Sequence, residues 1–502
     1  MKSYIPFRRF MTGIGILFYG GQTLLAQQEL SYHASSEINV SSGTYAPLWF
    51  TANKYGLSGV RPKSAFVRTG VEYEKKWTKN WQLKAGIDLA VAKNQVSQFV
   101  VQQAYADLSW KELTLSIGSK ERPGYPLEKD MAISSGMMVE GSNARPVPQI
   151  RFDIKNYITV PHTRKWLGVR GHIAYGIFTD ANWQKHFVPE SHPEKGQYYL
   201  YTEKVWYHSK SLMFRIGNKE VFPMEFELGI LDAAQFGGNQ MYRLSDGTSV
   251  KNKDMSKGFS TFINAFIPKH ESTLQNVSGN HCGSWNFALT GYINNWKIRT
   301  YLEHYYEDHS QMFWQYGRWK DGQIGVEVTL PKNRWLTAAL YEGINTTDQT
   351  GPILYDAPAG SFSEIQQSGG DNYFNNGEYL GWQHFGQTMG LSLIPGPQYN
   401  ADHQNRINSS RIRANHFGFR GTPFKEWSWR MLFSSVRHYG TYIYPLDKVR
   451  KQFSSLYEVT FCPKRFTGWS AKASLGLDRG NYLGNSTGFM FTISKSGYLF
   501  NK

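Results

Sequence analysis

The stretch AFVRTGVEYEKKWTKNWQLKAGIDLAV, residues 65–91, alternates with a period of two on both sides of a short polar segment. Val67 and Val71 share one face of the first run, whereas Arg68 and Glu72 share the other, and the alternation resumes at Trp81. Successive side chains of a β-strand point to opposite faces. Two such runs joined by Thr-Lys-Asn therefore predict a β-hairpin with one apolar face and one charged face.

The same alternation recurs along the chain, and aromatic residues gather where the runs meet their turns. Further runs occur around residues 167–177, 285–302, 324–340 and 469–477. Aromatic residues at strand ends are typical of the interfacial girdle of a transmembrane barrel; here they are Trp77, Trp81, Trp296, Trp335 and Trp469. A soluble β-sandwich can show the same alternation, whereas a propeller needs a fixed repeat that we do not find. We predict an all-β fold, a transmembrane antiparallel β-barrel, with on the order of 16–20 strands.

The first 26 residues have the three parts of a secretory signal peptide. Basic residues within positions 2–9 precede a mostly apolar run at 10–25, and Ala26 stands before two glutamines. An N-terminal membrane anchor fits less well, because glycines interrupt this short run. No later stretch has the ~18 consecutive apolar residues that a spanning helix needs. We therefore expect residues 1–26 to be removed on export, and residues 27–502 to form a single barrel domain with long surface loops in the outer membrane of a Gram-negative bacterium.

The chain carries a formal net charge of +16 without any block of five basic residues. Export argues against nucleic acid as a partner, and the spread charge suits a pore wall or a broad anionic surface. Cys282 and Cys462 allow at most one disulfide, and we expect both to be ordinary strand or turn residues. Outer-membrane lipid is the expected surrounding, and we expect a monomer.

Two segments rich in Gly, Pro and Asn resemble the capsule assembly Wzi family, in its Bacteroides-like branch. The first reads SSG at residues 134–136 and SNARPVPQ at 142–149; the second reads DNYFNNGEY at 371–379, followed by Gly381, Trp382 and Gly386. The sequence departs from the family pattern at LSL, residues 391–393. The resemblance implies a barrel of about 18 strands, with a small helical or loop element closing the lumen at its periplasmic end.

The resemblance also implies a lectin-like role. Such a protein binds exported capsular polysaccharide or exopolysaccharide, and it helps to assemble or retain capsule at the cell surface without catalysing a reaction. The positive charge of this chain favours an acidic polymer.

The first segment cannot be a central strand, because Pro146 and Pro148 remove two backbone donors. One interpretation is a loop folded into the lumen, where the planar guanidinium of Arg145 suits a carboxylate or phosphate. In the alternative interpretation, Asn143 and Arg145 only tie the loop to carboxylates of the barrel wall.

The second segment is the stronger candidate for binding polysaccharide. Its amide and carboxylate side chains can bond sugar hydroxyls, and its rings can stack on sugar faces. The alternative is an Asx-rich loop with its aromatic rings packed inward. The predicted binding or lumen-lining residues of the two segments are Asn143, Arg145, Asp371, Asn372, Tyr373, Asn375, Asn376, Tyr379 and Trp382.

The sequence shows little sign of catalysis. A G-x-S-x-G motif is absent, and a same-face pair such as Glu225 and Glu227 is common in polar barrel walls. His304 and His309 would point to opposite faces of a strand. We therefore expect no catalytic residues, no metal site and no cofactor. The remaining alternatives are a diffusion porin for anionic solutes and a surface hydrolase.

Overall fold

The computed structural model describes most of the chain after the expected signal peptide. It describes residues 27–501, apart from residues 125, 256–257, 268–278, 308–319, 332, 350–352, 355–366 and 369–371. The predicted signal peptide and Asp371 lie outside the described residues.

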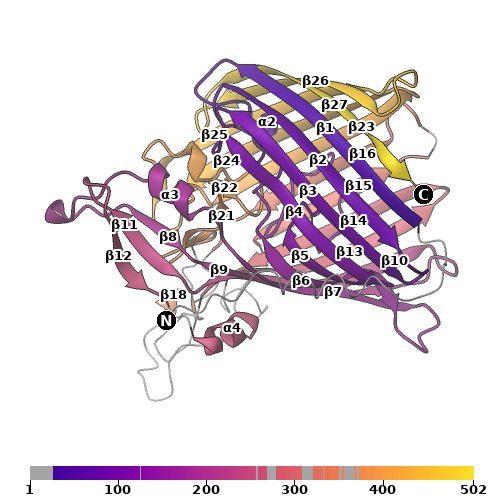
Figure 1. Ribbon diagram of the computed structural model, residues 1–502, viewed down its shortest axis with the longest axis horizontal. Helices are drawn as coiled ribbons and strands as arrows, with labels where there is room; N and C mark the ends of the chain where they lie inside the picture. The colour runs from indigo at the N-terminus through magenta and orange to yellow at the C-terminus, as the bar shows by residue number, and fades with distance from the viewer. Residues whose placement is uncertain are drawn as a thin grey trace, which may run out of the picture.

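Eighteen antiparallel strands form one sheet, in which each barrel strand pairs with the next along the chain. The first and last strands also pair, with Ile38 opposite Phe491, and this pairing closes the barrel (Figure 1). The predicted barrel and its strand number are confirmed. Its first nine strands are β1 (Gln27–Ser41), β2 (Lys63–Lys76), β3 (Trp81–Lys93), β4 (Phe99–Trp110), β5 (Leu113–Ser119), β6 (Gln149–Thr159), β7 (Leu167–Ile177), β9 (Trp206–Ile216) and β10 (Met224–Phe236). The others are β13 (Asn280–Ile293), β14 (Trp296–Tyr306), β15 (Gly322–Thr329), β16 (Ala338–Asn345), β23 (Ile412–Phe424), β24 (Trp427–Gly440), β25 (Pro445–Phe461), β26 (Trp469–Gly480) and β27 (Ser486–Asn501).

The predicted two faces of the hairpin become the outside and the inside of the barrel. Val67 on β2 and Val91 on β3 point outward, and 59% and 64% of their surfaces are exposed. On the opposite face, the guanidinium of Arg68 forms ion pairs with Asp88 on β3 and with Glu121 in the lumen. An apolar outer face and an ion-paired inner face are the arrangement of an outer-membrane barrel.

The two ends of the barrel differ in the length of their connections. One end has short turns, such as Asn294-Asn295, where both residues have positive φ as a two-residue hairpin requires. The other end carries the long connections. The predicted aromatic girdle is confirmed at the short-turn end, where exposed tryptophans flank successive turns: Trp81, Trp110, Trp166, Trp296, Trp335, Trp427 and Trp469. Short turns are typical of the periplasmic end and long loops of the outer face.

All described helices lie in connections at the long-loop end, so the expected helical element at the periplasmic end is not found among the described residues. They are α2 (Leu48–Thr51), α3 (Ala181–Phe187), α4 (Phe259–Phe266), and the 3-10 turns η2 (Pro193–Lys195) and η3 (Pro397–Tyr399). Among these helices, none has the length and apolarity that crossing a membrane would require.

A small sheet projects beyond the long-loop end of the barrel, as Figure 1 shows. It consists of β8 (Leu200–Glu203), β11 (Asn239–Arg243) and β12 (Ser249–Asp254). The sequence of these strands does not alternate between apolar and polar residues. Two of the strands are short, and they lie among residues that are typical of loops. Shorter paired segments occur in the connection between β16 and β23: β17 (Ile353–Leu354), β18 (Gln367–Ser368), β19 (Asn375–Asn376), β20 (Leu380–Gly381), β21 (Gln383–His384) and β22 (Gln387–Thr388).

Two long connections fill the lumen and bind each other. They are the described part of residues 120–148, between β5 and β6, and residues 372–411, between β16 and β23. Together we call them the plug. The Nε1 of Trp382 donates a hydrogen bond to Val139 O at 2.9 Å, and Gly141 N donates to Met389 O at 2.9 Å. The two segments that carry the family resemblance are therefore partners inside the barrel.

Buried carboxylates of the barrel wall hold the plug by its backbone. Ser135 N donates to Glu342 Oε2 on β16 at 2.8 Å, and Met138 N donates to Glu303 Oε2 on β14 at 2.9 Å. Gly418 on β23 permits close approach, since a Cβ there would lie 2.1 Å from the carbonyl oxygen of Ile133. The wall and the plug therefore form one packed unit.

We expect the substitution Glu342→Ala to loosen the plug. It removes the acceptor of Ser134, Ser135 and Tyr301, and each buried polar group left unsatisfied costs about 1–3 kcal/mol. Planar-bilayer recording should show more frequent conducting events, and the urea midpoint in detergent should fall. Glu72→Ala removes a lumen carboxylate that pairs with Lys84 at 2.8 Å, so it is the matched control. If both variants showed the same frequency of conducting events and the same urea midpoint, Glu342 would not anchor the plug.

Candidate functional site

Asn143 and Arg145 bind other lumen loops and not the carboxylates of the wall. The amide of Asn143 donates from Nδ2 to Thr388 O at 2.9 Å and accepts from Asn53 N at 3.2 Å. The guanidinium carbon of Arg145 lies 3.8 Å from the ring centroid of Phe385. Burial lowers the pKa of Arg145 to about 10, so the side chain stays charged at neutral pH. Both residues join the two halves of the plug.

The polar residues of the second segment shape its backbone. The Oδ1 of Asn376 accepts from Glu378 N at 2.8 Å, which is an Asx turn. The amide of Asn375 bonds both backbone groups of Ile407, at 3.0 and 2.8 Å. Asn372 and Asn375 also line a hollow on the outer surface, described below. This part of the predicted segment therefore reaches the long-loop surface.

The aromatic rings of the second segment are buried, as in the alternative interpretation of an inward-packed loop. Tyr373, Tyr379 and Trp382 are all less than 5% exposed. The ring of Tyr305, from the wall strand β14, stacks on Phe374 at 4.8 Å. None of these rings offers a face to a sugar in this structure.

We expect Trp382→Ala to act on stability, because the indole is fully buried and bonds Val139. Removing a buried Trp costs about 3–5 kcal/mol. The urea midpoint of the refolded protein should fall well below that of Trp335→Ala, which removes an exposed girdle residue. A stable Trp382→Ala protein that had lost polysaccharide binding would instead support a direct contact.

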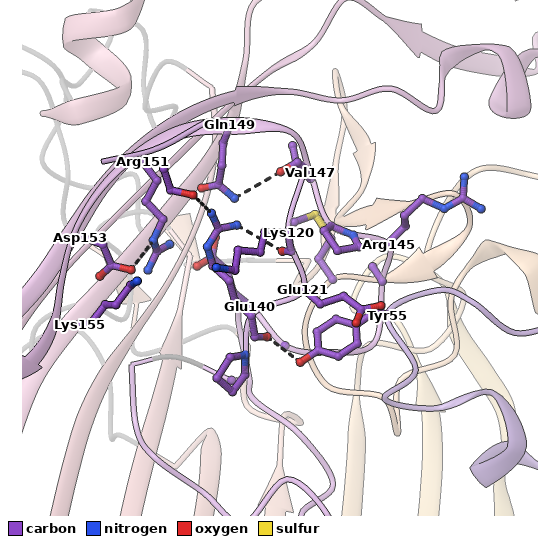
Figure 2. Close-up of a pocket in the computed structure, with 18 of the residues that line it drawn as sticks. Tyr55, Lys120, Glu121, Glu140, Arg145, Val147, Gln149, Arg151, Asp153 and Lys155 are labelled. Carbon is purple, nitrogen blue, oxygen red and sulfur yellow. Dashed lines mark hydrogen bonds and ion pairs between the residues drawn. The ribbon is translucent and has the colours of Figure 1, made fainter. Parts of the chain in front are cut away.

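A cavity of about 420 Å³ lies in the lumen between the plug and the wall. Figure 2 shows Arg151, Asp153 and Lys155 following one another along β6, with Tyr55 across the cavity. The charges are largely paired: Arg151 Nε lies 3.2 Å from Asp153 Oδ2, and Lys120 Nζ lies 2.5 Å from Asp107 Oδ2. The lining holds both basic and acidic side chains, and these pairs offset part of the basic charge.

A buried histidine connects the two halves of the plug. The Nδ1 of His384 donates to Arg145 O at 2.8 Å, and its Nε2 accepts from Thr179 N at 3.3 Å. This bonding requires a neutral ring, and burial lowers the pKa of His384 below its ordinary value of 6.5.

Acidification should therefore loosen this junction. The unfolded chain takes up a proton on His384 below about pH 6.5, while the folded chain resists it, so stability falls as the pH falls. Urea unfolding at pH 8 and pH 5 should show a smaller loss in His384→Gln than in the wild-type protein. His162→Gln alters an exposed histidine in the β6–β7 turn and should keep the wild-type loss. An unchanged loss in His384→Gln would contradict the role of this ring.

The long-loop surface has a hollow of about 370 Å³ that we call the tyrosine hollow. Tyr198 and Tyr444 line it and are 49% and 63% exposed. Arg406 lies beside them, with its guanidinium carbon 5.4 Å from the ring centroid of Tyr444, and it pairs with Asp402 at 3.0 Å. The wall is otherwise rich in amides: Asn372, Asn375, Asn376, Gln404 and Asn405.

A second, larger hollow of about 750 Å³ adjoins the first, and both are lined by Val188. We call it the basic hollow, because Arg61 and Arg243 line it together with His186 and His403. Trp183 and Phe187 add aromatic surface, with their rings stacked at 4.7 Å. Among the described residues that line the two hollows, none is an Asp or Glu.

Of the residues that line these hollows, the sequence predicted only Asn372, Asn375 and Asn376. The others come from segments far apart in the chain: 42–62, 94–98, 178–205, 239–243, 372–411 and 441–444. A signal was available in the short connection TYIY, residues 441–444, where exposed aromatic residues occupy a turn between two strands.

The residue clusters considered for catalysis have structural partners. Glu225 and Glu227 do share the lumen face, but Tyr292 donates to Glu225 at 3.0 Å and Tyr157 donates to Glu227 at 2.7 Å. The ring of His304 bonds Asp321 O at 2.7 Å. Among the described residues, no group of three potential metal ligands is found; His309 lies outside them. Both cysteines are free, Cys282 buried and Cys462 exposed.

The fold is similar to that of known outer-membrane barrels. One solved structure is Wzi of Escherichia coli, described as an outer-membrane protein involved in group 1 capsule assembly and a carbohydrate-binding β-barrel: TM-score 0.56, 13% identity, covering 97% of this chain and 86% of that chain. OccD3 of Pseudomonas aeruginosa has a TM-score of 0.45 with 8% identity, covering 94% of this chain and 92% of that one. No family model matches the sequence, and neither does any curated protein.

These likenesses concern the fold. At 13% identity, the match to the Escherichia coli barrel shows a common architecture over nearly the whole chain. The protein is therefore a barrel of the outer-membrane type, and its membership of the Wzi family remains a prediction from the two resembling segments.

Proposed function

We propose that this protein is a lectin-like member of the Wzi family that binds exported polysaccharide at the long-loop surface and helps to retain capsule on the cell. The observation that carries the proposal is the pair of adjoining hollows, which combine exposed rings, amides and arginines. The description of the Escherichia coli barrel as carbohydrate-binding adds support.

The tyrosine hollow has the chemistry that a sugar needs. The flat C–H faces of a pyranose can stack on Tyr198 and Tyr444, while side-chain amides bond its hydroxyls.

The favoured ligand is an acidic polymer. Arg61 and Arg243 lie along the basic hollow without a carboxylate in its described lining, whereas Arg406 of the tyrosine hollow also pairs with Asp402. Arginine binds carboxylate and phosphate through its planar fork, and an extended polymer can cross both hollows. In this proposal the protein acts alone as a monomer, with no catalysed reaction and no cofactor.

The plug favours binding over transport. It fills the lumen with two segments that bond each other and the wall. A diffusion porin needs an open aqueous path, so single-channel recording distinguishes a porin from a closed polysaccharide-binding barrel. A steady large conductance in the wild-type protein would favour the porin for anionic solutes.

We expect Tyr444→Ala and Arg406→Gln to weaken binding of an acidic polymer. The probe is alginate, a polyuronate, with dextran as the neutral comparison, and titration calorimetry of the protein in detergent is the measurement. Alginate binding should weaken steeply between low and high salt, since salt screens exposed charges. Salt-independent binding would refute the electrostatic part of the proposal.

Matched controls lie at the opposite end of the barrel. Tyr498 and Arg465 are exposed near the short-turn end, so Tyr498→Ala and Arg465→Gln should bind alginate as the wild-type protein does. In cells, a deletion strain should release its polysaccharide into the medium, and the Tyr444→Ala gene should restore retention less well than the Tyr498→Ala gene. Unchanged retention in the deletion strain would contradict the proposed function.

A further inference from the structure

The outer face of the barrel wall carries a charged cluster. On β9, Lys210 shares the outward face with the exposed Leu212 and Ile216, since alternate residues of a strand point the same way. The Nζ of Lys210 forms an ion pair with Asp232 on β10. The Oδ1 of Asp232 also lies 3.2 Å from Nδ1 of His281 on β13. The cluster therefore spans three neighbouring strands on the side that faces the membrane.

The height of this cluster is unusual for charged residues. Lys210 lies six residues from Ile216, the last residue of β9 at the short-turn end. With a rise of about 3.3 Å per residue and a tilt of about 40°, it lies roughly 15 Å above that end, within an apolar band about 25 Å tall. On β2 and β3, residues farther from the same end, Val67 and Val91, are exposed aliphatics. A charge facing lipid at such depth costs about 2–4 kcal/mol.

The helix α4 covers this cluster from outside the barrel. The ring centroid of Phe266 lies 5.5 Å from Lys210 Nζ, which also lies 3.5 Å from Ala265 O. Tyr175, on the outward face of β7, donates its hydroxyl to Phe262 O at 3.0 Å. Figure 1 shows α4 beside the wall, next to β9. The helix therefore covers most of the cluster: the side chains of Lys210, Asp232 and His281 are 23%, 9% and 2% exposed.

The other side of α4 is also apolar. Phe259, Ile263, Phe266 and Ile267 are 81%, 44%, 38% and 55% exposed. Within α4, the spacing of Phe259, Ile263 and Phe266 places them on one stripe, with Phe266 at the edge beside the wall. Ile267 follows the last residue of the helix. Phe262 and Ala265 face the wall. A helix with apolar residues on both of these sides is typical of a buried or membrane environment. Exposed to water, the stripe would be an unfavourable apolar patch.

We propose that α4 lies in the membrane at the long-loop end of the barrel, with the Phe259–Ile263–Phe266 stripe and Ile267 against lipid acyl chains. The stripe continues the apolar outer surface formed by Leu212 and its neighbours. The apolar surface of the wall is interrupted at the Lys210–Asp232–His281 cluster. There, the stripe on α4 takes its place as the lipid-facing surface. This inference concerns the outer wall and does not depend on the proposed polysaccharide binding.

Site-directed fluorescence quenching tests the proposal. The background is Cys462→Ser, which leaves only the buried Cys282. Single cysteines at Ile263, Phe259, Val67 and Asp246 are then labelled with a bimane probe. The proteins are reconstituted into phosphatidylcholine vesicles, and quenching by doxyl-labelled lipid is compared with quenching by aqueous iodide. Heat-modifiable migration in gels verifies that each variant has folded.

The probe at Ile263→Cys should be quenched several-fold more by doxyl lipid than by iodide, as at Val67→Cys on the exposed wall. The probe at Phe259→Cys should show the same preference for doxyl lipid. Agreement of two positions would show that the result is not a local effect of one substitution. Asp246→Cys, in an exposed loop, should respond mainly to iodide. Iodide quenching at Ile263→Cys equal to that at Asp246→Cys would overturn the proposal. So would protection from both quenchers, because protein would then cover the stripe.

Discussion

An eighteen-stranded barrel is too wide for its own side chains to fill. The lumen face of this barrel also carries buried carboxylates, which need donors away from bulk water. The two long plug segments meet both needs at once: they occupy the space, and their backbone N–H groups bond Glu303 and Glu342. Plug and wall are therefore interdependent, since neither would satisfy its polar groups alone.

This dependence explains what the two punctuated segments do. Their asparagines form turns and hold neighbouring loops, while their rings pack against each other and against the wall. Such loops are rigid, because their side chains are used internally. The rigid plug in turn positions Asn372 and Asn375 at the outer surface, where they meet tyrosines from other connections. In the proposed function, the ligand would meet a support that it does not have to order.

The same rule of satisfying polar groups operates on the outer wall. Lys210, Asp232 and His281 pair with one another, and α4 shields them with apolar side chains. The barrel thus stabilises its buried charged side chains in two ways. Inside, backbone donors of the plug bond the carboxylates, and Nζ of Lys129 lies 3.3 Å from Glu303. Outside, a short helix covers the charges, because lipid offers neither donors nor acceptors.

The strand pattern, the aromatic girdle and the tight turns could be predicted from the sequence, because each depends on neighbours along the chain. The alternation around Val67 and Arg68 and the Asn294-Asn295 turn are examples. The family resemblance correctly indicated the barrel and a loop element in its lumen, but it placed a helical element at the periplasmic end, where none is described.

The site depended on contacts between distant parts of the chain. Trp382 and Tyr444 both stand in loop-like, aromatic-rich sequence, yet the first is fully buried and the second is largely exposed. Trp382 packs in the apolar core of the lumen, and Val139, more than two hundred residues away, accepts the hydrogen bond of its buried N–H. Tyr444 is exposed because its short turn stands at the rim, beside Arg406. Local spacing determines which way a strand residue points, but only the packing of the loops against one another determines which of their side chains remain available to a ligand.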